Sequence, residues 1–133
     1  AILALESADI IVLAPSNPFL SLLPILKIPA INSTIIRKSH APKIAVSPLI
    51  SGKAIKGPAD KLMNELGFVP DSSGICELYK DFLDVLIIDN KDVRSVTSIN
   101  RGNVQVRSTD ILMNSIEKKM YLASFIIEIA SEF

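Results

Sequence analysis

The chain contains 133 residues, enough for one domain with its own hydrophobic core, and its 14 basic residues balance 14 acidic ones. No run of like charge occurs, which excludes the electrostatic footprint of a nucleic-acid-binding protein or of a protein that docks on an anionic membrane. A single cysteine, Cys76, and a single histidine, His40, exclude an internal disulfide and a Cys/His metal site. We expect Cys76 to pack in the core and the protein to be cytoplasmic.

The first forty residues are rich in apolar side chains but do not predict a membrane helix. The apolar stretch at residues 10–31 is interrupted by prolines at positions 15, 18, 24 and 29, which an uninterrupted membrane-spanning helix would not contain.

Residues 1–6 look like the tail of a helix with no cap before it, and the first residue is not Met. We therefore expect a truncated domain, with residues 1–133 forming a single α/β unit.

Three short apolar runs rich in β-branched residues predict buried strands, at residues 10–13, 43–46 and 85–88. Continuous apolarity, as opposed to alternation, is typical of strands that are covered on both faces in a parallel sheet. A weaker run at residues 104–106 alternates, so we expect it near an edge of the sheet.

Helical patterns separate these strands. Residues 24–38 predict one helix or two short ones, with a break at Pro29 or a second cap at Asn32–Ser33. Further helices are expected over 58–66, ending at Gly67, and over 75–81, 92–99 and 115–129. The apolar face of the last helix is predicted to comprise Ile116, Met120, Ala123, Ile126, Ile127 and Ala130.

The alternation of strands and helices predicts an α/β fold with a mostly parallel, Rossmann-like sheet and helices on both faces. In such sheets, ligands bind where the strands end. The first strand leads into a small, polar turn in which Ser16, Asn17, Pro18 and Ser21 could contact a phosphate or a polyol. An ordinary turn, with Ser16 or Asn17 as a helix cap, explains the same residues.

The second strand leads into a loop with the same character. Ser47, Pro48, Lys53, Lys56 and Gly57 could form the other side of one shared site, because both ammonium groups flank small residues that let a phosphate approach the backbone. The alternative is a pair of solvated lysines in a flexible loop.

Other polar residues have simpler explanations. Asp89 follows the third strand and is expected to cap the next turn, His40 to be solvated, and Thr109–Asp110 to start a helix, unless Thr109 contacts ligand. No glycine-rich phosphate fingerprint is present, and no catalytic residue or metal ligand can be assigned from this chain.

Several segments together resemble the 2-phospho-L-lactate transferase family of coenzyme F420 biosynthesis. They cover nearly the whole chain in the family's order: residues 8–18 (ADIIVLAPSNP), 24–26 (PIL), 47–63 (SPLISGKAIKGPADKLM), 79–84 (YKDFLD) and 109–113 (TDILM). Two glycines usual in the family are replaced, by Ala14 and by Ser51.

The resemblance implies a magnesium-dependent transfer. The terminal ribityl hydroxyl of the deazaflavin Fo attacks the phosphorus that bears the lactyl (or enolpyruvyl) group of a guanosine diphosphate-linked donor, lactyl-diphospho-guanosine, so that F420-0 forms and GMP leaves. It also implies that this chain is the carboxyl-terminal part of a longer enzyme, with the glycine-rich nucleotide loop and the Mg2+-binding aspartates mainly in the absent amino-terminal part. We expect the chain to be inactive alone and the enzyme to be a homo-oligomer, a dimer.

Two alternative hypotheses for the function are kept beside the transferase. Gluconeogenesis-factor-like proteins, which resemble this family in fold and bind nucleotide sugars without catalysis, typically have a Gly-Ser-Leu turn where this chain has residues 16–18, and they lack the pattern at 47–58. The third possibility is an α/β interaction module that pairs with itself through an exposed apolar face.

Overall fold

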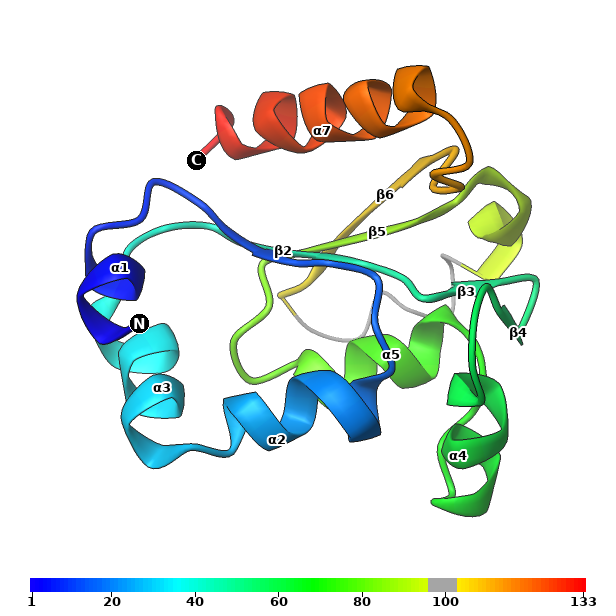
Figure 1. The fold of residues 1–133 in the computed structure, drawn as a ribbon, viewed down its shortest axis with the longest axis horizontal. Helices are drawn as coiled ribbons and strands as arrows, with labels where there is room; N and C mark the ends of the chain where they lie inside the picture. The colour runs from blue at the N-terminus through cyan, green and yellow to red at the C-terminus, as the bar shows by residue number, and fades with distance from the viewer. Residues whose placement is uncertain (96–102) are drawn as a thin grey trace.

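The computed structural model describes residues 1–95 and 103–133, and in these residues a four-stranded parallel sheet forms the centre of the molecule (Figure 1). The strands lie in the order β1 (Ile11–Leu13), β2 (Lys43–Val46), β5 (Val85–Asp89) and β6 (Gln105–Thr109). The predicted α/β fold with a parallel sheet is therefore confirmed. β6 corresponds to the weaker run predicted at residues 104–106. It is longer than expected, and it lies at an edge of the sheet as its alternating pattern indicated.

Both faces of the sheet are covered at the central strands β2 and β5, which explains their continuous apolar runs. The prediction of a fully buried first strand is wrong, because Val12 in β1 is 43% exposed. Side chains alternate between the two faces, so Ile44 and Val85 pack on one side while Ala45 and Leu86 pack on the other. Figure 1 shows α7 (Ile116–Ala130) over the first face and α2 (Leu23–Leu26) and α5 (Ser72–Tyr79) over the second. Every residue of β5 is buried as a result.

The crossover from β1 to β2 is helical but bent. It comprises a π-helical turn, η1 (Pro18–Leu22), followed by α2, and then α3 (Pro29–Ser33) followed by a second π-helical turn, η2 (Thr34–Lys38). The two halves meet at 76° next to Pro29, so the predicted break is confirmed there. The predicted cap at Asn32–Ser33 is wrong, because both residues lie inside the helical run.

No single helix among the described residues is long and apolar enough to cross a bilayer. Only the two halves of this crossover, Pro18–Leu26 and Pro29–Lys38, reach the required length and composition when they are taken together.

The remaining short helices follow local sequence signals. α1 (Ile2–Glu6) begins the chain, and α4 (Ala59–Glu65) ends just before Gly67, whose φ of +81° suits the predicted glycine terminus. α5 begins earlier than predicted, because Asp71 caps it by accepting hydrogen bonds from the backbone N–H groups of Ser73 and Gly74. Cys76 lies in this helix and is buried, as expected, and burial raises the pKa of its thiol.

A 3₁₀ helix, η3 (Asn90–Ser95), follows β5. The helix predicted over 92–99 overlaps it only at its first residues, and the rest of that prediction lies outside the described residues.

The last helix forms where predicted, after the Ser115 cap, but the predicted apolar face is only partly correct: of its six residues, only Ile126 is buried. Leu122, Ile126 and Ile129 face the sheet, whereas Ile116 and Ile127 are 64% and 66% exposed. The remaining predicted residues divide in the same way, with Met120 and Ala123 exposed and Ala130 partly buried. α7 carries apolar residues on two adjacent stripes, and the periodicity of the sequence cannot show which stripe docks on the sheet.

The loop after β2 is a β-hairpin. β3 (Leu49–Ile50) and β4 (Lys53–Ala54) pair antiparallel around a two-residue turn, in which Ser51 and Gly52 have φ values of +51° and +72°. Positive φ at both positions defines a type I′ turn, which favours Asn-Gly. The Ser51 N–H donates to both carboxylate oxygens of Asp92, at 3.0 and 3.1 Å, which anchors the turn on η3.

Ser51→Asn is expected to stabilise the protein by about 1 kcal/mol, because asparagine tolerates the left-handed conformation better than serine and keeps the N–H donor. Chemical unfolding of the intact protein measures the change. Ser51→Val is the matched control and should destabilise, since β-branched residues resist positive φ. An asparagine variant no more stable than the wild type would contradict the strain assigned to this turn.

Candidate functional site

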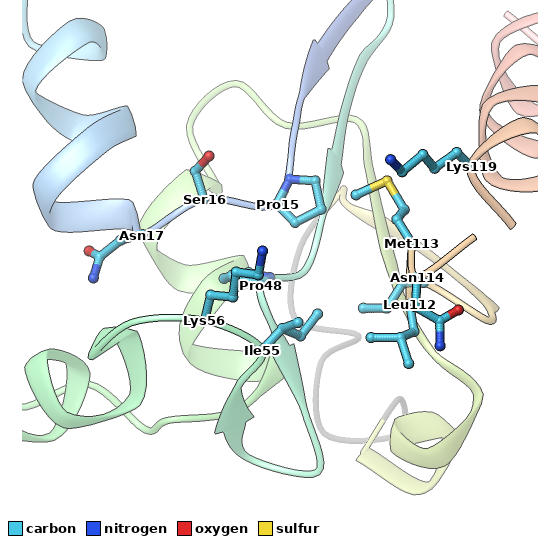
Figure 2. A pocket seen from close by; sticks show the side chains of 11 residues that line it. Pro15, Ser16, Asn17, Pro48, Ile55, Lys56, Leu112, Met113, Asn114 and Lys119 are labelled. Carbon is cyan, nitrogen blue, oxygen red and sulfur yellow. The ribbon is translucent and has the colours of Figure 1, made fainter. Parts of the chain in front are cut away.

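The carboxyl ends of the parallel strands bring three separate segments to one edge of the sheet. They surround a cavity of about 490 Å³ (Figure 2), which we call the edge pocket. Its lining residues come from the turn after β1, the hairpin region after β2, and the segment that connects β6 to α7: Pro15, Ser16, Asn17, Pro48, Ile55, Lys56, Ile111, Leu112, Met113, Asn114 and Lys119. The expectation that the first two turns share one edge and one cavity is therefore confirmed.

The turn after β1 also has a structural role. Oδ1 of Asn17 accepts hydrogen bonds from the backbone N–H groups of Phe19 and Leu20, at 3.0 and 3.1 Å, and so caps the helical turn η1. Pro18 is buried at the first position of that turn. The Nδ2 atom of Asn17 is buried and has no hydrogen-bond partner among the described residues.

Only part of the predicted first-turn site lines the edge pocket. Ser16 and Asn17 line it, whereas Pro18 and the exposed Ser21 on η1 are not among its lining residues. In Figure 2 the amide of Asn17 is directed away from the middle of the pocket. The helix-cap explanation of Asn17 is thus correct, and its contact with a ligand stays a prediction.

Of the predicted residues after β2, too, only some line the edge pocket. Pro48 and Lys56 line the edge pocket, and the backbone N–H of Ile55 donates to the Pro48 carbonyl at 3.1 Å to close the base of the hairpin. Ser47 is fully buried, where its hydroxyl exchanges hydrogen bonds with the backbone of Leu49.

Two further predicted residues, Lys53 and Gly57, are not among the residues that line the pocket. The Lys53 side chain is 84% exposed and lies 4.0 Å from the carboxylate of Asp60 in α4. Gly57 is exposed with a φ of +73°. Ligand contact by these two residues stays a prediction.

The third wall was missed by the sequence analysis. Thr109–Asp110 does not start a helix: Thr109 is the buried last residue of β6, and residues 110–114, which form neither helix nor strand, lead from there to Ser115. Asp110 accepts a hydrogen bond from the backbone N–H of Leu112 at 3.0 Å, which turns this segment toward the pocket. One signal could have located it, since a fourth parallel strand also ends at the same edge.

Asp89 connects this wall to the sheet. It is 5% exposed, and its Oδ1 accepts a hydrogen bond from the backbone N–H of Lys91 at 3.0 Å, so the predicted turn cap is confirmed. Its Oδ2 accepts a longer bond, 3.4 Å, from the backbone N–H of Ile111. One buried carboxylate therefore links the end of β5 to a residue that lines the edge pocket.

The charge of the edge pocket favours an anionic ligand. Lys56 and Lys119 line it, and none of its described lining residues carries a carboxylate. Six apolar side chains, with Ser16, Asn17 and Asn114, complete the lining of a cavity of the size that small molecules occupy. Within the described residues no group of three or more His, Cys, Asp or Glu side chains could hold a metal ion.

Comparison with known proteins shows the family of this chain. The family model of 2-phospho-L-lactate transferase CofD matches residues 1–124. The chain is 42% identical over 126 residues to the 2-phospho-L-lactate transferase of Methanococcoides burtonii. The aligned region covers 95% of this chain and 40% of that protein. The enzymes of the same name from Methanosarcina acetivorans and Methanocaldococcus jannaschii are both 37% identical, over 93% and 96% of this chain and 39% of each protein.

The chain thus spans about 40% of the length of the curated relatives it matches. The match to the family model extends from the first residue into α7 and includes all three walls of the edge pocket. The chain belongs to the 2-phospho-L-lactate transferase family.

Proposed function

We propose that this chain contributes part of the substrate site of a 2-phospho-L-lactate transferase that makes F420-0. The reaction moves the 2-phospholactyl (or enolpyruvyl phosphate) group from a guanosine diphosphate-linked donor to the deazaflavin Fo. The terminal ribityl hydroxyl of Fo forms a new bond to the phosphorus that bears the lactyl group. The bond from that phosphorus to the bridging oxygen breaks, GMP leaves with the electron pair, and the hydroxyl proton is released.

The observation that supports this proposal is the edge pocket in a chain of this family. Transfer of a phosphoryl group depends mainly on holding donor and acceptor in line and on balancing negative charge. A cavity of about 490 Å³, lined by two lysines and without a carboxylate among its described lining residues, suits a phosphate-bearing substrate. Three segments that are distant in sequence converge there, so the position of the substrate would be fixed from several sides.

Three further features belong to the same proposal. The enzyme is proposed to need Mg2+, with ligands supplied mainly by residues outside this chain, since the described residues offer no suitable cluster. It is also proposed to act in the cytoplasm as a homodimer. The chain alone is expected to be inactive.

The test is an assay of the intact protein with Fo, magnesium and lactyl-diphospho-guanosine, in which mass spectrometry detects F420-0 and GMP. Product formation supports the transferase. Tight binding of a nucleotide sugar with no phosphodiester product would instead indicate the gluconeogenesis-factor-like regulator.

Lys56→Met in the intact enzyme is expected to lower kcat/KM by about tenfold, because a charge-assisted contact to a phosphate is lost. Steady-state kinetics measure the change. The matched control is Lys61→Met, which removes the same charge from the exposed face of α4, outside the pocket, and should leave kcat/KM unchanged. Equal kinetics for the two variants would contradict the assignment of the edge pocket as the substrate site.

A further inference from the structure

The start of α7 brings a positive charge to the edge pocket. Lys119 lies in the first turns of the helix after the Ser115 cap, and it lines the pocket on the side opposite the turn that follows β1. Figure 2 shows Lys56 and Lys119 extending toward the space beside Pro15 from opposite sides. Neither side chain forms an ion pair with any described residue. Two ammonium groups from distant parts of the sequence therefore converge on one cavity.

The neighbouring residue Lys118 does not contribute its charge to the edge pocket. Lys118 faces a separate cavity that also includes Asp110 and Glu117, and its ammonium lies 2.8 Å from the Asp110 carboxylate. This ion pair lowers the pKa of the Asp110 carboxyl. The charge of Lys118 is thus neutralised within the protein, whereas the charge of Lys119 is available to a ligand.

Apolar side chains share the cavity with these two lysines. Ile55, Leu112 and Met113 line it, while Lys56 and Lys119 are themselves exposed to solvent. Two ammonium groups placed on either side of a cavity match a ligand with at least two negative charges. Of the two substrates in the proposed reaction, only the guanosine-linked donor carries a diphosphate.

We propose that Lys119 is a donor-binding residue and that, with Lys56, it holds the diphosphate of the guanosine-linked substrate. This inference rests on the proposed function for the identity of the ligand. It adds a specificity-determining residue from the carboxyl-terminal helix, a part of the chain to which the sequence analysis assigned no site residue.

The experiment compares Lys119→Met, Lys119→Arg and Lys61→Met in the intact enzyme. Lys119→Met is expected to raise the KM for the donor about tenfold, with the KM for Fo unchanged and kcat reduced less. Lys119→Arg keeps the charge and should restore most of the donor affinity, and Lys61→Met should behave as the wild type. A wild-type donor KM for Lys119→Met, or an increase confined to the KM for Fo, would overturn the proposal.

A binding measurement separates this inference from the proposed reaction. Inorganic pyrophosphate is titrated into the wild type and the three variants by calorimetry. Weaker binding by Lys119→Met alone, with less dependence on ionic strength than in the wild type, supports the anion site even if the wild type forms no F420-0. Equal pyrophosphate affinity in all variants would overturn the site, whatever the transferase assay shows.

Discussion

Gly74→Ala is expected to destabilise the protein by about 3 kcal/mol, although alanine is favoured over glycine in a helix by about 1 kcal/mol. Gly74 is buried in α5, where a Cβ atom would lie 2.0 Å from the carbonyl oxygen of Val69 and 2.7 Å from the terminal methyl carbon of Met63. A backbone carbonyl cannot turn aside as a flexible side chain can. The helix would have to move away from the chain that precedes it, and the core on this face of the sheet would loosen.

Chemical unfolding of the intact protein, followed by circular dichroism, measures this loss. Gly57→Ala is the matched control, because no atom lies within 4 Å of its added Cβ and only its positive φ of +73° opposes the substitution. We expect that variant to lose about 1 kcal/mol. A Gly74→Ala protein as stable as the wild type would show that α5 does not pack as closely on Val69 as the structure describes.

Asp89→Ala should cost about 2 kcal/mol of stability and should also weaken donor binding. The carboxylate is buried, and its loss leaves the backbone N–H groups of Lys91 and Ile111 without their acceptor. Because Ile111 begins the third wall of the edge pocket, the segment between β6 and α7 is expected to shift. The donor KM of the intact enzyme should therefore rise together with the loss of stability.

Unfolding and steady-state kinetics test the two effects separately. Asp81→Ala serves as the control, since it removes an exposed carboxylate from the end of the α5 region and touches neither N–H group. Wild-type stability in Asp89→Ala would contradict the bridging role. Reduced stability with an unchanged donor KM would show that this carboxylate supports the fold but not the position of the pocket wall.

Much of the fold follows from local sequence signals. The β-branched runs that contain Ile44 and Val85 predicted buried strands, and their alternation with helices predicted parallel pairing. Parallel pairing then requires the turns after β1 and β2 to meet at one edge, which is why two of the three walls of the edge pocket could be located without coordinates. Gly67 and Ser115 likewise predicted helix ends, because glycine adopts positive φ after a helix and a serine side chain accepts a hydrogen bond at a helix start.

Other parts of the site depended on contacts between distant residues. The hairpin turn directs Lys53 toward Asp60 and leaves Lys56 at the pocket, although both lysines lie in the same small loop of the sequence. The contribution of Lys119 depends on the position of α7 relative to β1 and β2. The residues around Lys119 do not indicate where α7 lies relative to these strands.

The sequence by itself determined the class of fold, the positions of the four parallel strands along the chain, and the family, because strand periodicity and family motifs depend on neighbouring residues. Only the tertiary structure decided which apolar stripe of α7 packs on the sheet, and which polar residues surround one cavity. Docking of an entire helix depends on the summed fit of many side chains, and no local segment contains that information.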